Sequence, residues 1–410
     1  MRWIKLNSNY LVMDIFLIIY GIVAVFPPAT VLFNSTLISI LCLGAWLIAS
    51  LLIDRDYYKS LNNVYPVFFL IITIAFPYVF GASVIGNRYL NLNMIPMGFL
   101  IFNFYKKNHH IENLKRIALI ITFFATITLL ITLQALTADP YISRSIKSTG
   151  EYSSDLARRG IGGYSFIYFT AISSQFLLYI SLKTRSSSVR IVTIILYILT
   201  FFFVLKSSYM TALLIVILSS VALIVVNLVH RNLEKKIIGI VVIIAMVLLL
   251  SNLNGIIDKF SDVIPKRIAN IVIVNDGQSI FSSIWDEFVS DRWPTLMSSI
   301  SAFIKAPLFG LVGAGQLSSY DGGVSGFGQH SYILDTFALY GVFVGLLNSY
   351  IVLRPFRHNK EYDTFLNASI FACTAIVYLL NNATPAIAMA LGILYPLVGE
   401  YYSSNSLIKE

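Results

Sequence analysis

Long uninterrupted apolar runs, repeated along the whole chain, are the feature that most constrains how this sequence folds. Many of them extend over about 16 to 22 residues, which as a helix is enough to cross a hydrocarbon core of about 30 Å. The run IVTIILYILTFFFVL (191–205) is apolar on every face, whereas strands of a membrane barrel alternate polar and apolar side chains. The sequence therefore predicts an all-α polytopic membrane protein.

The composition agrees with this class. Hydrophobic residues make up 57% of the 410 positions and charged residues only 12%, with a mean hydropathy of +0.78. Soluble domains have about 45–50% apolar and about 25% charged residues. We expect a single integral membrane domain over residues 1–410 with twelve transmembrane helices. They are placed at 11–26, 35–53, 64–83, 90–105, 117–136, 162–182, 190–205, 208–229, 237–251, 330–353, 364–381 and 385–402.

Most of the 29 lysines and arginines fall in alternate short loops between these spans. Short cytoplasmic loops carry such an excess, so the pattern predicts a multi-pass protein with both termini in the cytoplasm. The net charge of +9 then reflects orientation in the membrane and does not argue for nucleic acid, which needs a basic patch on a soluble face. Cys42 and Cys373 both fall within predicted spans, so we expect no structural disulfide.

Two predicted extracytoplasmic loops, 137–161 and 252–329, hold most of the remaining cations. The second loop is too long for a simple connector and is interpreted as functional. Its apolar residues recur at helical spacing over 281–289 and 293–304, which predicts two amphipathic helices on the outer membrane surface. Arg292 precedes the second helix, where free backbone N–H groups favour an anion.

His330 is the one histidine outside the cytoplasmic loops under this topology. It is either an interfacial residue that closes a polar helix end or a general base, a role suited to an unperturbed pKa of about 6.5. Asp335 lies well inside the next span, where an acidic residue is costly, and has either a structural hydrogen-bonding role or a catalytic role. It lies about 140° round the helix from His330 and is therefore a poor orienting partner for it.

Glycines are concentrated shortly before His330. Gly310, Gly313 and Gly315 either supply the backbone freedom that tight turns need or let backbone amides come close to a ligand. A nucleotide-binding loop is disfavoured, because no βαβ pattern surrounds them and the loop faces the side of the membrane without ATP.

Two stretches resemble the signature of bacterial Wzy-type O-antigen and capsule polymerases and the related O-antigen ligases. In SDRWPTLMSSISAFIKAPLFGLVGAG (290–315) and QHSYILDTFALYGVFVGLL (329–347), the family's arginine, glycine turn and histidine match Arg292, Gly310 and His330. Ser331 replaces the asparagine that commonly follows the histidine. A second arginine-then-glycine motif matches SSDLARRGIGGYSF (153–166), and spacing does not decide between Arg158 and Arg159.

The resemblance implies a fold of the membrane glycosyltransferase C type. It also implies a glycosyltransferase that polymerises undecaprenyl-diphosphate-linked oligosaccharides into O-antigen or capsule at the outer face of the bacterial cytoplasmic (inner) membrane. Its implied partners are that lipid-linked oligosaccharide, the lipid bilayer, and a chain-length regulator and flippase of the same pathway. Arg292 and either Arg158 or Arg159 would bind the diphosphate. His330 would act as the base or hydrogen-bond the diphosphate.

Other interpretations stay open. No acidic cluster occurs in the first outer loop, so we predict a reaction without a bound metal or other cofactor. An O-antigen ligase would use the same residues to transfer finished polymer to an acceptor. A lipid-linked oligosaccharide flippase also has about twelve helices, but transporters usually place ionisable groups at mid-membrane. Arg144 and Lys147, in the shorter loop, are interpreted as charges that attract an anionic substrate.

Overall fold

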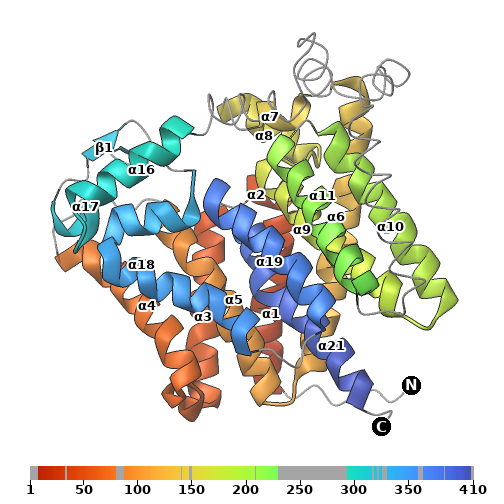
Figure 1. The fold of residues 1–410 in the computed structure, drawn as a ribbon, viewed down its shortest axis with the longest axis horizontal. Coiled ribbons are helices and arrows are strands. Elements are labelled where there is room, and N and C mark those ends of the chain that lie inside the picture. The colour runs from red at the N-terminus through yellow and green to blue at the C-terminus, as the bar shows by residue number, and fades with distance from the viewer. Residues whose placement is uncertain are drawn as a thin grey trace.

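Nearly all of the chain that the structure describes is helical (Figure 1). This computed structural model describes residues 8–32, 35–79, 87–139, 141–146, 150–207, 209–229, 293–315, 318–320, 323–325, 330–358, 363–382 and 384–407. The first half contains α1 (Ser8–Val25), α2 (Pro27–Leu32), α3 (Ser35–Ile53), η1 (Arg55–Lys59), α4 (Leu61–Val79), α5 (Asn87–Lys107), α6 (Ile111–Ala138), α7 (Ile142–Ser145), α8 (Gly150–Arg158), α9 (Tyr164–Lys183), α10 (Ser187–Lys206) and α11 (Met210–Val229).

The second half combines further helices with one short hairpin. The helices are α16 (Trp293–Lys305), α17 (Gly310–Gly313), α18 (Tyr332–His358), α19 (Thr364–Leu380), α20 (Pro385–Met389), the π-helix η2 (Ala390–Leu394) and α21 (Tyr395–Leu407). Strands β1 (Ser318–Tyr320) and β2 (Gly323–Ser325) pair antiparallel, with Ser319 opposite Val324.

Every predicted span except 237–251 overlaps one or more described helices, whereas 237–251 and the last residues of the span 64–83 lie outside the described residues. Four of these helices, α6, α9, α10 and α18, are long and apolar enough to cross a membrane. The described part of the chain is therefore almost entirely helical, with four helices suited to cross a membrane, and the total of twelve spans stays a prediction.

One end of the bundle gathers the turns that the charge pattern assigns to the cytoplasm. The Tyr10 and His110 rings lie 3.8 Å apart between their centroids, which joins the start of α1 to the α5–α6 turn. The Lys106 ammonium lies 2.6 Å from Glu400 of α21. Lys183 at the end of α9 pairs with Asp363, which caps α19. Helix starts and ends from across the chain therefore meet here, as an alternating bundle requires.

The predicted outer loop 137–161 lies at the opposite end and contains the short helices α7 and α8. Figure 1 shows α2, α7, α8 and α16 together at this end, away from the end where α21 finishes. The Gly162 amide donates to the Thr132 hydroxyl at 2.7 Å, which ties the exit of the loop to α6. The described part of the first long loop is therefore packed onto the bundle.

The predicted span over 330–353 is not one continuous helix. Gly341, inside α18, has φ 77° and ψ −172°, a backbone conformation that is essentially restricted to glycine. The chain therefore forms two helical segments, Tyr332–Tyr340 and a longer one after the break. Apolar residues continue through this point, so the hydropathy pattern alone predicts an uninterrupted helix.

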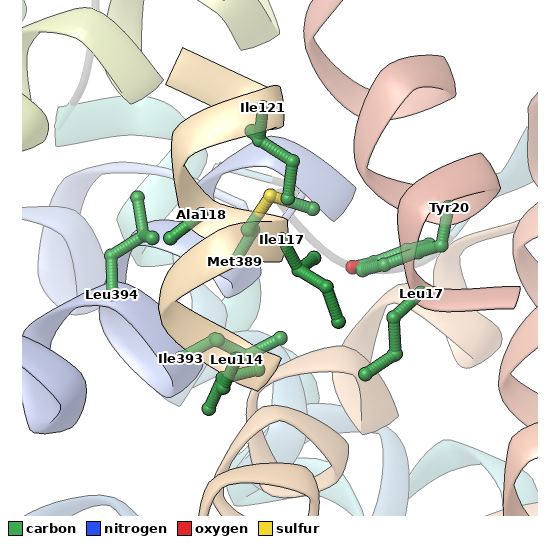
Figure 2. A pocket seen from close by; sticks show the side chains of 9 residues that line it. All are labelled: Leu17, Tyr20, Leu114, Ile117, Ala118, Ile121, Met389, Ile393 and Leu394. Carbon is green, nitrogen blue, oxygen red and sulfur yellow. The ribbon is translucent and has the colours of Figure 1, made fainter. Parts of the chain in front are cut away.

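Figure 2 shows an apolar pocket between α1, α6 and the α20–η2 segment. It is lined by Leu17, Tyr20, Leu114, Ile117, Ala118, Ile121, Met389, Ile393 and Leu394. The Tyr20 hydroxyl donates to the Pro385 carbonyl at 3.0 Å, so the polar group of this lining is already bonded to the protein. The pocket offers no charged side chain for chemistry.

Candidate functional site

The helices that follow the two predicted outer loops meet at the turn between α19 and α20. The Tyr164 hydroxyl, at the start of α9, donates to the Asn381 side-chain oxygen at 2.7 Å. The Tyr332 amide, at the start of α18, donates to the Asn381 carbonyl at 3.0 Å. Asn381 is fully buried. It therefore joins two helix starts that are far apart in the sequence.

Local sequence explains why a turn forms here. Asn381 ends α19 in an extended conformation, and the Thr384 hydroxyl accepts from the Ile387 amide to cap α20. Pro385 occupies the first helical position, where its missing N–H costs nothing. The Ser165 hydroxyl donates to the Thr384 hydroxyl at 2.8 Å, a second contact between α9 and this turn.

His330 is half-buried directly before α18. The Ser331 hydroxyl accepts from the Leu334 amide at 3.2 Å and so caps this helix. It also donates to the Tyr378 carbonyl of α19 at 3.1 Å. Serine and asparagine are both good helix caps, so Ser331 retains the capping ability of the asparagine in the family pattern. The position of His330 is thus fixed by the residues that follow it.

Asp335 connects α18 to the amphipathic helix α16. The Ser299 hydroxyl donates to Asp335 Oδ1 at 2.6 Å, and the Ser331 amide donates to Oδ2 at 3.3 Å. The Asp335 side chain is buried, and these partners supply the hydrogen bonds that a buried carboxylate needs. Of its two open roles, these contacts favour the structural one.

We expect Asp335→Ala to destabilise the protein by about 1.5–3 kcal/mol, because it leaves a buried hydroxyl and a buried amide without their charged acceptor. Retention of monodisperse protein after heating in detergent measures the effect. Ser301→Ala, on an exposed position of α16, is the matched control. Equal heat resistance of the two variants would contradict the proposed link between the helices.

The predicted amphipathic helix over 293–304 is present as α16. Its protein-facing side is formed by Leu296, Ser299 and Ala302, whereas Trp293 and Ile304 are 49% and 68% exposed. The helix thus packs on the bundle by one side and leaves large apolar side chains outward. The other predicted helix, over 281–289, lies outside the described residues.

Gly310 lies where two stretches of backbone cross. A Cβ atom at Gly310 would lie 2.2 Å from the Leu339 carbonyl oxygen, and one at Gly341 would lie 2.2 Å from the Leu308 oxygen. The Val342 amide, released by the break in α18, donates to the Pro307 carbonyl at 2.8 Å. The glycine turn therefore packs against the break in α18.

The other two predicted loop-shaping glycines differ from Gly310. A Cβ atom at Gly313 would lie 2.3 Å from the Phe309 Cβ. Gly315 has φ +64° and nothing within 4 Å of an added Cβ atom. The requirement for glycine at these positions comes from contacts within the protein or from backbone conformation.

The arginines predicted to bind a diphosphate have different environments. Arg159 lies 2.8 Å from Asp155 one helical turn earlier, and both side chains are well exposed. Arg158 ends α8, is also exposed, and makes no ion pair within the described part of the chain. Arg292 lies outside the described residues. Of the two described arginines, Arg158 and Arg159, only Arg159 has a carboxylate that competes with a bound anion.

Arg144, which was predicted only to attract an anionic substrate, contacts an aromatic cluster. Its guanidinium carbon lies 5.0 Å from the centroid of the Tyr209 ring. The Tyr209 ring in turn packs against Tyr164 and Tyr168, at centroid distances of 6.0 and 6.3 Å. These tyrosines lie near the starts of α9 and α11, directly after polar loops, which is the sequence signal that would have pointed to them.

Within the described residues, no three histidine, cysteine or acidic side chains are placed to hold a metal ion. Comparison of the chain with family models, curated proteins and solved structures found no match. Function is therefore inferred from the chemistry of this end of the bundle together with the motifs in the sequence.

Proposed function

We propose that this protein is a glycosyltransferase that polymerises undecaprenyl-diphosphate-linked oligosaccharides into a surface polysaccharide such as O-antigen or capsule. The reaction takes place at the outer face of the bacterial cytoplasmic membrane, with both termini of the protein in the cytoplasm. The supporting observation is that both helices entering from cation-bearing loops are held at Asn381, with His330 half-buried beside this junction. A histidine and several cations thus lie at one end of an apolar bundle.

The proposed chemistry assigns each group one task. The acceptor hydroxyl attacks the anomeric carbon of the donor sugar and gives its proton to His330. The bond between this carbon and the phosphate oxygen breaks, and the diphosphate leaves with the bonding electrons. Arg292 neutralises the growing charge through paired N–H donors, and Arg158 is favoured over Arg159 as its companion because Asp155 already engages Arg159.

Purified protein in lipid vesicles, given a lipid-linked repeat unit, is expected to produce a ladder of longer glycans. Arg292→Ala should reduce elongation by about 100- to 1,000-fold, the usual cost of removing one preorganised donor to a developing anion. Arg292→Lys should restore only part of the rate, because an ammonium cannot bind two oxygens in a fork. An unchanged ladder with Arg292→Ala would refute the diphosphate role.

One observation favours a second candidate, a flippase for the same lipid-linked glycan. The break in α18 at Gly341 is of the kind found in transporters, where interrupted helices line the binding site. Deletion of the gene separates the candidates. Loss of a polymerase leaves single repeat units on the surface lipid, loss of a ligase leaves polymer on the carrier, and loss of a flippase prevents export of both.

A further inference from the structure

The connection from Arg158, at the end of α8, to Tyr164, at the start of α9, is held along its length. Helix α8 ends in a Schellman motif, in which the Ile161 amide donates to the Leu156 carbonyl at 3.1 Å and Gly160 between them has φ +84°. The next amide along the chain donates to a hydroxyl of α6 at 2.7 Å. The backbone position of Arg158 is therefore fixed relative to the start of α9.

Asn381 connects the start of α9 to the start of α18 through two different groups. Its side-chain oxygen accepts from the Tyr164 hydroxyl at 2.7 Å, and its backbone carbonyl accepts from the Tyr332 amide at 3.0 Å. Tyr332 is the first residue of α18 and lies two positions after His330. The backbone that carries Arg158 and the backbone that carries His330 are therefore joined through Asn381.

The burial of Asn381 indicates what an asparagine contributes at this position. The residue is fully buried, and within the described part of the chain its amide nitrogen has no hydrogen-bond partner. Such exceptions are rare in native proteins, because burial of an unpaired amide lowers stability. An apolar side chain would avoid this loss but could not accept from Tyr164. The contribution of the asparagine side chain is therefore its bond to the start of α9.

A second contact between α9 and the same turn offers a comparison. The Ser165 hydroxyl donates to the Thr384 hydroxyl at 2.8 Å, and Thr384 in turn accepts from the Ile387 amide and caps α20. Both contacts hold α9 against the turn between α19 and α20. Of the two, the contact made by Tyr164 continues to the start of α18.

We propose that Tyr164 and Asn381 are positioning residues, which hold Arg158 and His330 in one fixed arrangement for glycosyl transfer. The inference rests on the proposed function for the roles of Arg158 and His330. Tyr164 and Asn381 act by setting where the cation and the base stand when the acceptor hydroxyl attacks. Small displacements of reacting groups lower a rate strongly, so loss of this connection should slow the reaction step and leave substrate binding nearly unchanged.

Elongation by purified protein in lipid vesicles tests this division. Tyr164→Phe, which removes the hydroxyl and keeps the ring, should lower kcat by about 10- to 100-fold and leave KM for the lipid-linked repeat unit within about twofold. Ser165→Ala is the matched control, because it breaks the parallel contact to the same turn, and its kcat should stay within about threefold of the unchanged protein. Equal losses of kcat in the two variants would overturn the inference.

A double variant tests whether Tyr164 acts through His330. Tyr164→Phe should slow the His330→Ala variant by less than about threefold, because a positioning residue contributes little once the group that it positions is gone. Two independent contributions would instead multiply, and a double variant slowed by the product of the two single losses would contradict the assignment.

Hydrogen–deuterium exchange at the start of α18 tests the connection without turnover. In Tyr164→Phe the amides of residues 332–335 should exchange at least about fivefold faster, because Asn381 is no longer held by α9. Ser165→Ala should leave this exchange unchanged. Equal exchange in the two variants would overturn the connection. If Tyr164→Phe elutes as aggregate, Asn381→Ala, which removes the acceptor but keeps the backbone carbonyl, decides the question.

The exchange and the elongation measurements fail separately. Faster exchange in Tyr164→Phe without any glycan ladder from the unchanged protein would contradict the proposed polymerase and leave the connection intact. Faster exchange with an unchanged kcat would overturn the positioning role alone. A normal ladder from the unchanged protein, with unchanged exchange in Tyr164→Phe, would leave the polymerase intact and remove the role of Tyr164 and Asn381.

Discussion

His330→Ala is expected to stop glycan elongation while the protein stays folded. Loss of a general base lowers the rate of such a step by about 100- to 10,000-fold. The fold should tolerate the change because the start of α18 is held by Ser331 and Tyr332, through their bonds to Leu334, Tyr378 and Asn381. The measurement is the rate at which the ladder lengthens in vesicles that contain equal amounts of folded protein.

The pH dependence distinguishes the two roles open to His330. A general base acts in its neutral form, so the rate should rise with pH as His330 loses its proton. A histidine that binds diphosphate as a cation predicts the reverse, a rate that falls over the same interval. His110→Ala, at the other end of the bundle beside Tyr10, is the control and should keep the unchanged profile. Normal turnover by His330→Ala would exclude the general-base role of His330.

The helices were predictable because apolar length and flanking charge fix them locally. The span predicted at 35–53 coincides with α3, since Asp54 and Arg55 end the apolar run abruptly. The charge at the end of this run is also structural, because Asp54 caps the following short helix by accepting from the Tyr57 amide. Where the boundaries of a helix depend only on its own sequence, hydropathy and capping residues are sufficient to predict them.

The junction at Asn381 was not predictable in the same way. Its partners Tyr164 and Tyr332 lie in helices that are distant in the sequence, and each looks like an ordinary interfacial tyrosine on its own. The same holds for Asp335, whose partner Ser299 lies in another helix. The motifs did identify His330 as the head of a span. They did not identify the polar turn that holds this helix start in place.

The glycine turn was predictable only in part. The sequence predicted that Gly310, Gly313 and Gly315 shape the loop, and left open whether they serve a turn or a ligand. At Gly310 the close neighbour is the protein's own backbone at Leu339. In the second segment of this crossing, Gly341 lies equally close to the backbone at Leu308. Since Gly341 lies within an apolar run and resembles a packing glycine of a membrane helix, only the three-dimensional structure shows that the two glycines depend on each other.

Gly341→Ala is expected to destabilise the protein by about 2–6 kcal/mol. A conformation with φ 77° and ψ −172° costs a residue with a side chain about 1–3 kcal/mol. The new methyl group would also lie 2.2 Å from the Leu308 oxygen, and overpacking of this kind costs about 1–3 kcal/mol more. Thermal unfolding in detergent, followed by loss of monodisperse protein, is the measurement.

Two other glycines separate the causes of this loss. Gly44→Ala, in α3, has no atom within 4 Å of the new methyl group and should be neutral or slightly stabilising. Gly315→Ala has a positive φ but open space, so it should show the conformational cost alone. If Gly341→Ala lowers the thermal stability no more than Gly315→Ala does, the close approach to Leu308 does not contribute to the loss. If it is worse, elongation should fall with stability, because this crossing anchors the segment between His330 and Gly341 to the glycine turn.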